Sequence, residues 1–473
     1  MFENAPVILW CRRDLRLHDH PAMLAATGFG GPLIPVFIRD GSVDNLGAAA
    51  KWRLGLAIDA FSKTLAANRS RLILRSGPAL ETLACLIRET GARAVMWSRL
   101  YDPQSIARDR KIKSALREAG VFAESHHGHL LFEPWQIKTR QGGHYRVFTP
   151  MWREIEKREV PEPKTPPVNL KAPNTWPESE TLSDWQMGRS MNRGAAVCLP
   201  WQNAGEEAAL RQLERFSRSL IANYGAARDF AAKNGTSNLS ENLTYGEISP
   251  RQCWKAGLGA ARKSRKGAHA WLRQLAWREF AYHLMYHTPH ILVKNWREEW
   301  GRFPWKTNSE CGEAVVWKRG CTGVPFVDAA MREMYVTGRM HNRGRMIAAS
   351  YLVKHLLVHW KVGMDWFADC LTDWDPACNA MGWQWVAGSG PDSSPYFRIF
   401  NPDTQSVKFD PRQEYICKWI AEMSVSPSSE ALGYFDAVPL HWGLAPDMPY
   451  SNPILSLKSG RERALAAYRR FRQ

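Results

Sequence analysis

The chain has 473 residues, of which 45% are hydrophobic and 23% charged, a composition typical of a globular protein with one to three domains. No apolar run approaches the roughly 20 residues of a membrane span, and the N-terminus lacks the basic segment of a signal peptide, so we expect a cytoplasmic protein without a membrane partner. The 63 Lys and Arg against 46 Asp and Glu, a net charge of +17, favour a polyanionic partner but do not choose among DNA, RNA and acidic lipid.

The first 130 residues alternate short apolar runs with helical patterns, which predicts an α/β domain with a doubly wound parallel sheet. Strands are expected at Val7–Cys11, Leu33–Ile38, Leu72–Leu74, Ala94–Ser98 and Val121–Ala123, and helices at Ala48–Leu65, Ala79–Glu89 and Ser105–Ala119. No phosphate-binding glycine motif follows any of these strands.

Metal sites and disulfides are not expected. The nine cysteines include no CxxC pair, and His126, His127 and His129 lack a second cluster of ligands. Residues 131–200 have six prolines between Pro161 and Pro177, which indicates a long irregular connector.

From residue 201 to 473 strand signals are absent and helical patterns dominate, so we expect an all-α second domain. The polar loop 234–240 opens a helix, where free N–H groups and hydroxyls either bind an anionic phosphate or simply cap the helix. On the next long helix, Trp271, Gln274 and Arg278 are spaced to share a face, which favours the wall of a polar pocket or an exposed helix face.

Two further segments contain polar side chains at helix starts. In 340–346, Asn342, Arg345 and Met346 share a face, and Arg345 needs a partner such as Asp373 or Asp375. In Leu371–Asn401, Asp375 is followed by proline and reads as a helix N-cap, and Gly388 and Gly390 end that helix. Trp383 and Trp385 either fill the core or line a cavity for a flat, polar-edged molecule.

Several motifs together resemble those of the DNA photolyase and cryptochrome family, most closely its bacterial photolyases. They are the R-x-D-L-R-x-x-D pattern of 12–19, the Y-x-V-F-T-P segment of 145–150, the W-R-E-F motif of 277–280 and the Leu371–Asn401 stretch. The resemblance implies a light-driven carbon–carbon lyase, in which excited reduced FAD gives an electron to a cyclobutane pyrimidine dimer in UV-damaged DNA. It also implies that the dimer is held in a cavity of the helical domain.

The resemblance assigns residues to three roles. Electron transfer or the reaction itself involves Trp305, Trp360, Trp383, Asn379, Gln274 and Met346. FAD binding involves Tyr224, Thr236, Ser237, Asn238, Leu239, Ser240, Trp271, Arg278, Asn342, Arg345, Asp373, Asp375 and Asn379. DNA binding involves Arg228, Gln274, Trp277, Asn342, Arg343, Trp385 and Gln405.

Two residues depart from the patterns of the family and bear on the lesion. Enzymes that repair cyclobutane dimers usually have Glu where this chain has Gln274, and the (6-4) enzymes have a required His where it has Met346. Met346 therefore favours dimer repair over (6-4) repair. The alternatives are (6-4) photoproduct repair, since Gln274 resembles the residue of the (6-4) enzymes, a cryptochrome photoreceptor, and a basic nucleic-acid-binding protein without flavin.

The α/β domain is expected to hold an antenna chromophore, a folate (MTHF) or a deazaflavin (8-HDF). Gln104-Ser105 replaces the Asn-Glu pair that many folate-binding relatives have, so the sequence does not choose between them. We expect a monomer.

Overall fold

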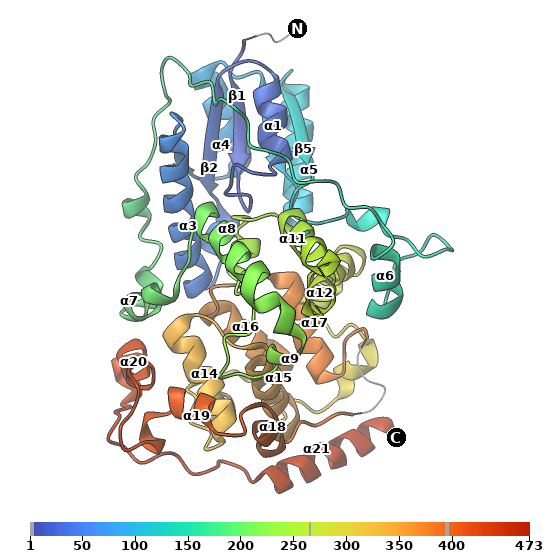
Figure 1. Ribbon diagram of the computed structural model, residues 1–473, viewed down its shortest axis with the longest axis vertical. Helices are drawn as coiled ribbons and strands as arrows, with labels where there is room; N and C mark the ends of the chain where they lie inside the picture. The colour runs from blue at the N-terminus through green and yellow to red at the C-terminus, as the bar shows by residue number, and fades with distance from the viewer. Residues whose placement is uncertain (1–3, 264–265, 393–396) are drawn as a thin grey trace.

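The computed structural model describes residues 4–263, 266–392 and 397–473. Figure 1 shows a sheet-containing half, built from the N-terminal part of the chain, above a larger helical half. No helix among these residues is both long and apolar enough to cross a bilayer.

The N-terminal half is built on five parallel strands in the order β3-β2-β1-β4-β5, so the predicted doubly wound sheet is confirmed. The strands are β1 (Val7–Cys11), β2 (Leu33–Arg39), β3 (Ile73–Ser76), β4 (Ala94–Ser98) and β5 (Phe122–His126). Side chains of β1 alternate between two cores: Val7 and Leu9 face one apolar cluster and Ile8 and Trp10 the other. Burial on both faces explains why the strand is a continuous apolar run.

The helices that cover this sheet are α1 (Pro21–Gly28), α2 (Gly41–Asp44), α3 (Ala48–Ala67), α4 (Ala79–Thr90) and α5 (Pro103–Glu118). Helix α1 was not predicted from the sequence, because its residues are mostly small or apolar and show no helical alternation. The local signal was present, however, because the His20 side chain caps the helix and Pro21 is its first residue.

The stretch expected to be an irregular connector, 131–200, is only partly irregular. No helix or strand lies between α6 (Phe148–Ile155) and the 3₁₀ turn η2 (Leu182–Trp185). The stretch also includes the short turns η1 (Pro134–Gln136), η3 (Arg189–Met191) and η4 (Leu199–Trp201) and the helix α7 (Gly194–Cys198). The expected domain limits of 1–130, 131–200 and 201–473 remain predictions.

From residue 201 onward, the regular elements of the described residues are helices joined by turns and loops, apart from one isolated bridge between Lys306 and Val358. The helices are α8 (Glu206–Arg215), α9 (Tyr224–Ala227), α10 (Ser240–Thr244), α11 (Pro250–Arg262), α12 (Gly267–His287), α13 (Gly312–Lys318), α14 (Pro325–Thr337), α15 (Asn342–Ser350), α16 (Trp360–Cys370), α17 (Pro376–Ala387), α18 (Pro402–Phe409), α19 (Glu414–Trp419), α20 (Ser429–Ala437) and α21 (Leu457–Arg472). Short 3₁₀ and π turns connect them, among them the 3₁₀ turn η8 (Glu298–Arg302) and the π-helix η9 (Tyr351–His355).

The apolar pattern between Met346 and Trp360 favours a single helix, but the structure does not form one. Helix α15 continues into η9, and α16 begins only at Trp360. Leu357 has a left-handed backbone, with φ of 53°, and Val358 forms the bridge to Lys306. A tertiary contact has therefore interrupted a segment whose hydrophobic pattern alone favours helix.

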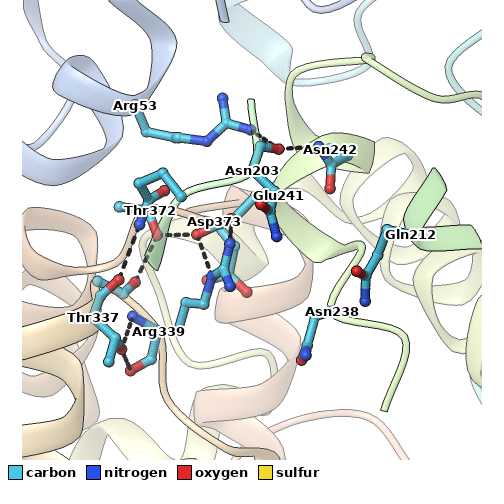
Figure 2. A network of polar contacts seen from close by, with 12 residues as sticks. Arg53, Asn203, Gln212, Asn238, Glu241, Asn242, Thr337, Arg339, Thr372 and Asp373 are labelled. Atoms are coloured by element: carbon cyan, nitrogen blue, oxygen red, sulfur yellow. Dashed lines mark hydrogen bonds and ion pairs between the residues drawn. The ribbon is translucent and has the colours of Figure 1, made fainter. Parts of the chain in front are cut away.

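A fully buried ion pair joins the two halves. The guanidinium of Arg53, on α3, is 2.7 Å from the carboxylate of Glu247, and both side chains have 0% exposure. Glu247 also accepts hydrogen bonds from the Asn242 side chain and the Gly205 backbone N–H. Figure 2 shows Arg53 reaching from α3 towards Asn203 and Asn242 of the helical half. A buried pair tolerates the removal of both charges far better than the removal of one.

We therefore predict that Arg53→Met lowers the free energy of unfolding by about 3–5 kcal/mol, because Glu247 is left buried without its partner. Urea unfolding followed by circular dichroism measures the loss. The control is Lys63→Ala, which breaks the exposed pair with Asp59 and should change stability by less than about 1 kcal/mol. Equal effects of the two substitutions would contradict the prediction.

Candidate functional site

A cavity of about 730 Å³ lies in the helical half, within the range of about 300–1,000 Å³ typical of ligand pockets. Its walls are formed by α9, the loop before α10, α12, α15 and α17. Among the residues predicted from the sequence, those on the wall are Tyr224, Arg228, Thr236, Ser237, Asn238, Leu239, Ser240, Gln274, Trp277, Arg278, Asn342, Arg345, Met346, Asp373, Asn379 and Trp383.

The loop 236–240 presents a row of hydrogen-bond donors to the cavity. Within the described residues, the backbone N–H groups of 236–240 donate no hydrogen bond to the protein. The loop is held from behind, because Gln212 donates to the Ser237 carbonyl at 2.9 Å and Thr236 to the Asn238 side chain at 2.8 Å. Consecutive free N–H groups beside serine and threonine hydroxyls make a binding site for phosphate oxygens.

On the opposite side of the cavity, an ion pair of Arg345 and Asp373 is already formed. The Arg345 guanidinium donates to both carboxylate oxygens of Asp373, at 2.9 and 2.8 Å, and its Nε–H donates to the Met340 carbonyl. Both bonds to Asp373 come from the same nitrogen, Nη2, and together with the Nε–H bond to Met340 they fix the orientation of the guanidinium on the cavity wall. Of the two partners that the sequence left open for Arg345, the structure selects Asp373.

Glu241 follows the loop directly in sequence, and Figure 2 shows it beside Thr372 and Arg339. Its buried carboxylate accepts hydrogen bonds from Arg339 and from the Thr372 hydroxyl. Thr372 directly precedes Asp373, and its backbone N–H donates to the Gly338 carbonyl at 2.8 Å. Three segments distant in sequence are therefore tied to one carboxylate under the cavity.

Helix α17 begins and ends at the predicted residues. The Asp375 side chain caps the Cys378 N–H at 2.8 Å, Pro376 is the first helical residue, and Gly388 ends the helix with φ of 89°. One turn into the helix, Asn379 lies on the cavity wall and donates to the Asp375 carbonyl at 2.9 Å. The side-chain oxygen of Asn379 has no partner among the described residues and is available to a ligand.

A second part of the wall is aromatic and amide-rich. Trp277 is covered on one face by Phe148, with ring centroids 3.8 Å apart and nearly parallel planes. Gln274 lies one turn before it on α12. Asn342 directs its amide nitrogen at the Met346 sulfur, 3.6 Å away. Flat rings beside amides fit the stacking and edge hydrogen bonds that nucleobases make.

Buried titratable groups lower the charge of the wall around the ion pair. Burial raises the pKa of Glu333 to about 7, and burial lowers the pKa of His341 to about 4. At neutral pH His341 is therefore neutral, and the positive charges of the cavity wall are those of its lysines and arginines, which include Arg228, Lys233, Arg339 and Arg345. This distribution suits an anionic ligand.

The three tryptophans assigned to electron transfer are buried in this half. Trp383 contacts Trp317 and Phe367, at centroid distances of 6.1 and 4.9 Å, and its ring lies against Gly363 of α16. Trp360 begins α16, and the His359 ring lies 5.2 Å from both Trp360 and Trp305. Trp305 in turn stacks on Trp300 at 5.6 Å.

Several predicted site residues lie away from the cavity wall. Trp271 is packed in the core against Phe216, and the Asp375 carboxylate is occupied by its cap and by the Tyr282 hydroxyl. Arg343 pairs with Asp229, and Trp385 lines a neighbouring smaller pocket. Gln405 is half-buried on α18, outside the cavity lining. Tertiary packing directs these side chains elsewhere, which spacing along the chain does not reveal.

Sequence reasoning missed other residues of the wall. Glu333, Thr337, Arg339, Cys378 and Lys418 all line the cavity. Of these, Arg339 had a local signal, because it is a charged residue directly before the predicted site segment 340–346. Among the described residues no group of three His, Cys, Asp or Glu side chains is placed to hold a metal.

The residues present fit FAD. The donor row of 236–240 can hold a pyrophosphate, and the Arg345–Asp373 pair with Asn379 supplies donors and acceptors for the edge of a flavin ring.

Comparison with known proteins agrees with this assignment. Residues 7–168 match the family model of DNA photolyase, and residues 271–470 match that of the FAD binding domain of DNA photolyase. A deoxyribodipyrimidine photo-lyase of Agrobacterium fabrum is 44% identical over 98% of both chains. Cryptochrome-2 of Arabidopsis thaliana is 33% identical over 98% of this chain and 79% of its own.

Solved structures show the same architecture. A class III photolyase from Agrobacterium tumefaciens has a TM-score of 0.91 at 42% identity and covers 100% of this chain and 98% of its own. A photolyase from Sulfolobus tokodaii, solved with two FAD molecules, has a TM-score of 0.79 at 29% identity, covering 98% and 100%. The family expected from the sequence and its enzyme class, photolyase, are thereby confirmed: the chain belongs to the DNA photolyase and cryptochrome family and contains its FAD-binding domain.

Proposed function

We propose that this protein repairs cyclobutane pyrimidine dimers in UV-damaged DNA, using blue light and reduced FAD. The observation that carries the proposal is that one cavity combines the phosphate-binding loop, the Arg345–Asp373 pair and the base-sized wall of Gln274, Trp277 and Met346. Reduced FAD, when bound there, supplies light-driven one-electron chemistry.

The residues of the chain hold and orient the two partners. The loop 236–240 and Arg345 fix the cofactor, while Trp277 offers a stacking surface to a base at the other wall. Photolyases are themselves among the enzymes known to extrude a base from the duplex, so this step is a property of the class. Extrusion costs roughly a few kcal/mol, and stacking on Trp277 would offset about 1–3 kcal/mol per base.

Met346 supports dimers over (6-4) photoproducts as the lesion. A thioether has no proton to donate or accept at neutral pH, and its sulfur is contacted by the Asn342 amide. Acid–base chemistry on the lesion is therefore not provided at this position. Gln274 keeps the ability to bond to base edges, since an amide both donates and accepts. A cytoplasmic, monomeric protein remains a prediction from the sequence.

Anaerobic incubation of the reduced holoprotein with an oligonucleotide containing a thymine dimer, under blue light, tests the proposal. We expect the dimer to disappear in light and to persist in darkness, with no loss of a (6-4) photoproduct in a parallel sample. Binding without loss of the dimer would favour the cryptochrome alternative. Loss of the (6-4) product alone would reassign the lesion.

We also propose an antenna chromophore. A second cavity supports a site for it, but that cavity is lined mainly by residues after 189, with only Ala48 and Ala49 from the α/β half in which the sequence led us to expect the pigment. This cavity, of about 420 Å³, is lined by Tyr335, Trp366 and Trp442, whose rings lie 5.3–6.4 Å apart, and by Lys318 and Arg319. The same lining includes the carboxylates of Glu310 and Asp369, and Glu310 pairs with Lys318 at 3.0 Å, so the aromatic faces suit a planar molecule but the charge of the cavity does not choose between a folate and a deazaflavin. The absorption spectrum of pigments released by heat identifies the molecule.

We predict that Trp383→Phe prevents light-driven reduction of the oxidised flavin but leaves repair by chemically reduced enzyme largely intact. The substitution removes a redox-active indole and keeps an aromatic ring, at the cost of the Cη2 and Cζ3 atoms that lie against Gly363. Blue-light bleaching of the flavin spectrum measures the first effect and dimer loss the second. Trp97→Phe, in the core of the α/β half, is the control. Loss of both activities in Trp383→Phe would refute its assigned role.

We predict that Gln274→Ala weakens binding to dimer-containing DNA by roughly 2–10-fold, the value of one or two lost hydrogen bonds. Binding to undamaged DNA should change little, because that contact is to the lesion. Gln274→Glu should keep or raise dimer repair. A collapse of repair in Gln274→Glu would instead show that the donor N–H of the amide is required. Fluorescence anisotropy with both DNAs provides the comparison.

A further inference from the structure

A smaller pocket, of about 110 Å³, lies on the other side of the last turn of α17 from the main cavity. Trp385 and Val386 line it, and Val386 also lines the main cavity, so the two hollows are separated only by that turn. Its size is far below the range of about 300–1,000 Å³ that cofactors and drug-sized ligands occupy. The pocket therefore suits a small chemical group.

Four cationic side chains line this pocket. Arg297 precedes η8, Arg398 lies shortly before α18, and Arg472 is the last residue of α21. Within the described residues none of these three guanidinium groups forms an ion pair or hydrogen bond, and the lining contains one carboxylate, that of Glu299. The pocket has an excess of unpaired positive charge, which attracts an anion.

The fourth cation, Lys354, is the most unusual. It lies on η9 with 1% exposure, and the part of the chain that the structure describes provides no carboxylate to pair with it. Its ammonium donates to the Ala387 carbonyl at 2.6 Å and lies 3.7 Å from the centre of the Phe397 ring. Burial lowers the pKa of Lys354 well below its ordinary value.

The Lys354 ammonium can either cap the C-terminal end of α17 or bind an anion in the pocket. As a cap on the C-terminal end of α17, it needs only the Ala387 carbonyl and explains nothing about the arginines. As the floor of an anion site, it uses its remaining N–H donors, and a bound anion offsets the cost of burying an unpaired charge. The second reading accounts for all four cations together.

We propose that this pocket binds one phosphodiester group of the DNA strand beside the damaged site. The inference rests on the proposed function, since it extends the surface on which DNA is bound. A backbone phosphate is favoured over a free one because the pocket adjoins the cavity proposed for the lesion. The rings of Trp300, Tyr468 and Phe471 beside the cations also suit a sugar or base next to the phosphate.

Binding as a function of salt tests this proposal. The affinities of the FAD-loaded wild type and of the double variant Arg297→Ala/Arg472→Ala for DNA are measured by fluorescence anisotropy between about 50 and 300 mM NaCl. Phosphate contacts make the affinity fall measurably over this range of salt. Losing one phosphate contact should reduce the slope of log K against log[salt] by about 0.9. Damaged and undamaged DNA should be affected alike, because a phosphate contact does not read the base.

The matched control is Arg470→Ala, on the same helix, exposed and outside the pocket lining. Its slope should change less than that of the double variant. Lys354→Met tests the floor of the pocket separately and should decrease the slope of log K against log[salt] as the double variant does. If Lys354→Met does not fold, the arginine variants alone decide. Flavin absorbance per protein should equal that of wild type in every variant used.

Three outcomes would overturn the proposal or its basis. If the slope is unchanged in the double variant while wild type binds DNA normally, the pocket does not bind a DNA phosphate, and the proposed function is unaffected. Calorimetric binding of inorganic phosphate that is lost in the double variant, with the DNA slope unchanged, assigns the pocket to a free phosphate instead. A wild type that does not bind DNA overturns the proposed function and this inference with it.

Discussion

The buried carboxylate of Glu241 is the interaction on which the site depends. It accepts hydrogen bonds from Arg339 and Thr372, and so joins the start of α10 to the segment after α14 and to the segment before α17. The phosphate-binding loop ends at α10, and Asp373 follows Thr372. A carboxylate without exposure must be paired or it costs several kcal/mol. Satisfying Glu241 therefore fixes the distance between the two walls that hold the cofactor.

Some polar groups of the cavity are already paired within the protein and others are free, and the free groups indicate where a ligand must supply hydrogen-bond acceptors. Arg345 and Asp373 satisfy each other, so the ring side of the cavity is formed before any ligand enters. The N–H groups of 236–240 are unpaired within the described residues and so need an acceptor from outside. Preformed pairs at one end and free donors at the other fit a cofactor whose charge is concentrated in its pyrophosphate.

Helix α17 is the shared wall of two sites. Asn379 and Trp383 face the main cavity, while Trp385 and Val386 reach the small cationic pocket. Its two ends are fixed by different means: Asp375 caps the first turn and Lys354 contacts the last carbonyl. A helix held at both ends keeps the two sites at a constant separation. This is what a protein needs if one side holds a damaged base and the other a neighbouring phosphate.

The sequence by itself determined the features that depend on neighbouring residues. Strands buried on both faces have continuous apolar sequences, Asp375-Pro376 and Gly388 marked the ends of α17, and the polar loop 234–240 marked a part of the chain that lines the cavity. Only the tertiary structure decided which distant groups meet. It determined that the Tyr282 hydroxyl donates to Asp375, that Phe148 covers Trp277 and that Trp385 lines a separate pocket. It also determined that the helical segment after α15 ends before Trp360. The physical reason is that caps and strand patterns act over a few residues, whereas the pairing of a buried charge or ring depends on contacts between segments far apart in the sequence, 93 residues for Tyr282 and Asp375.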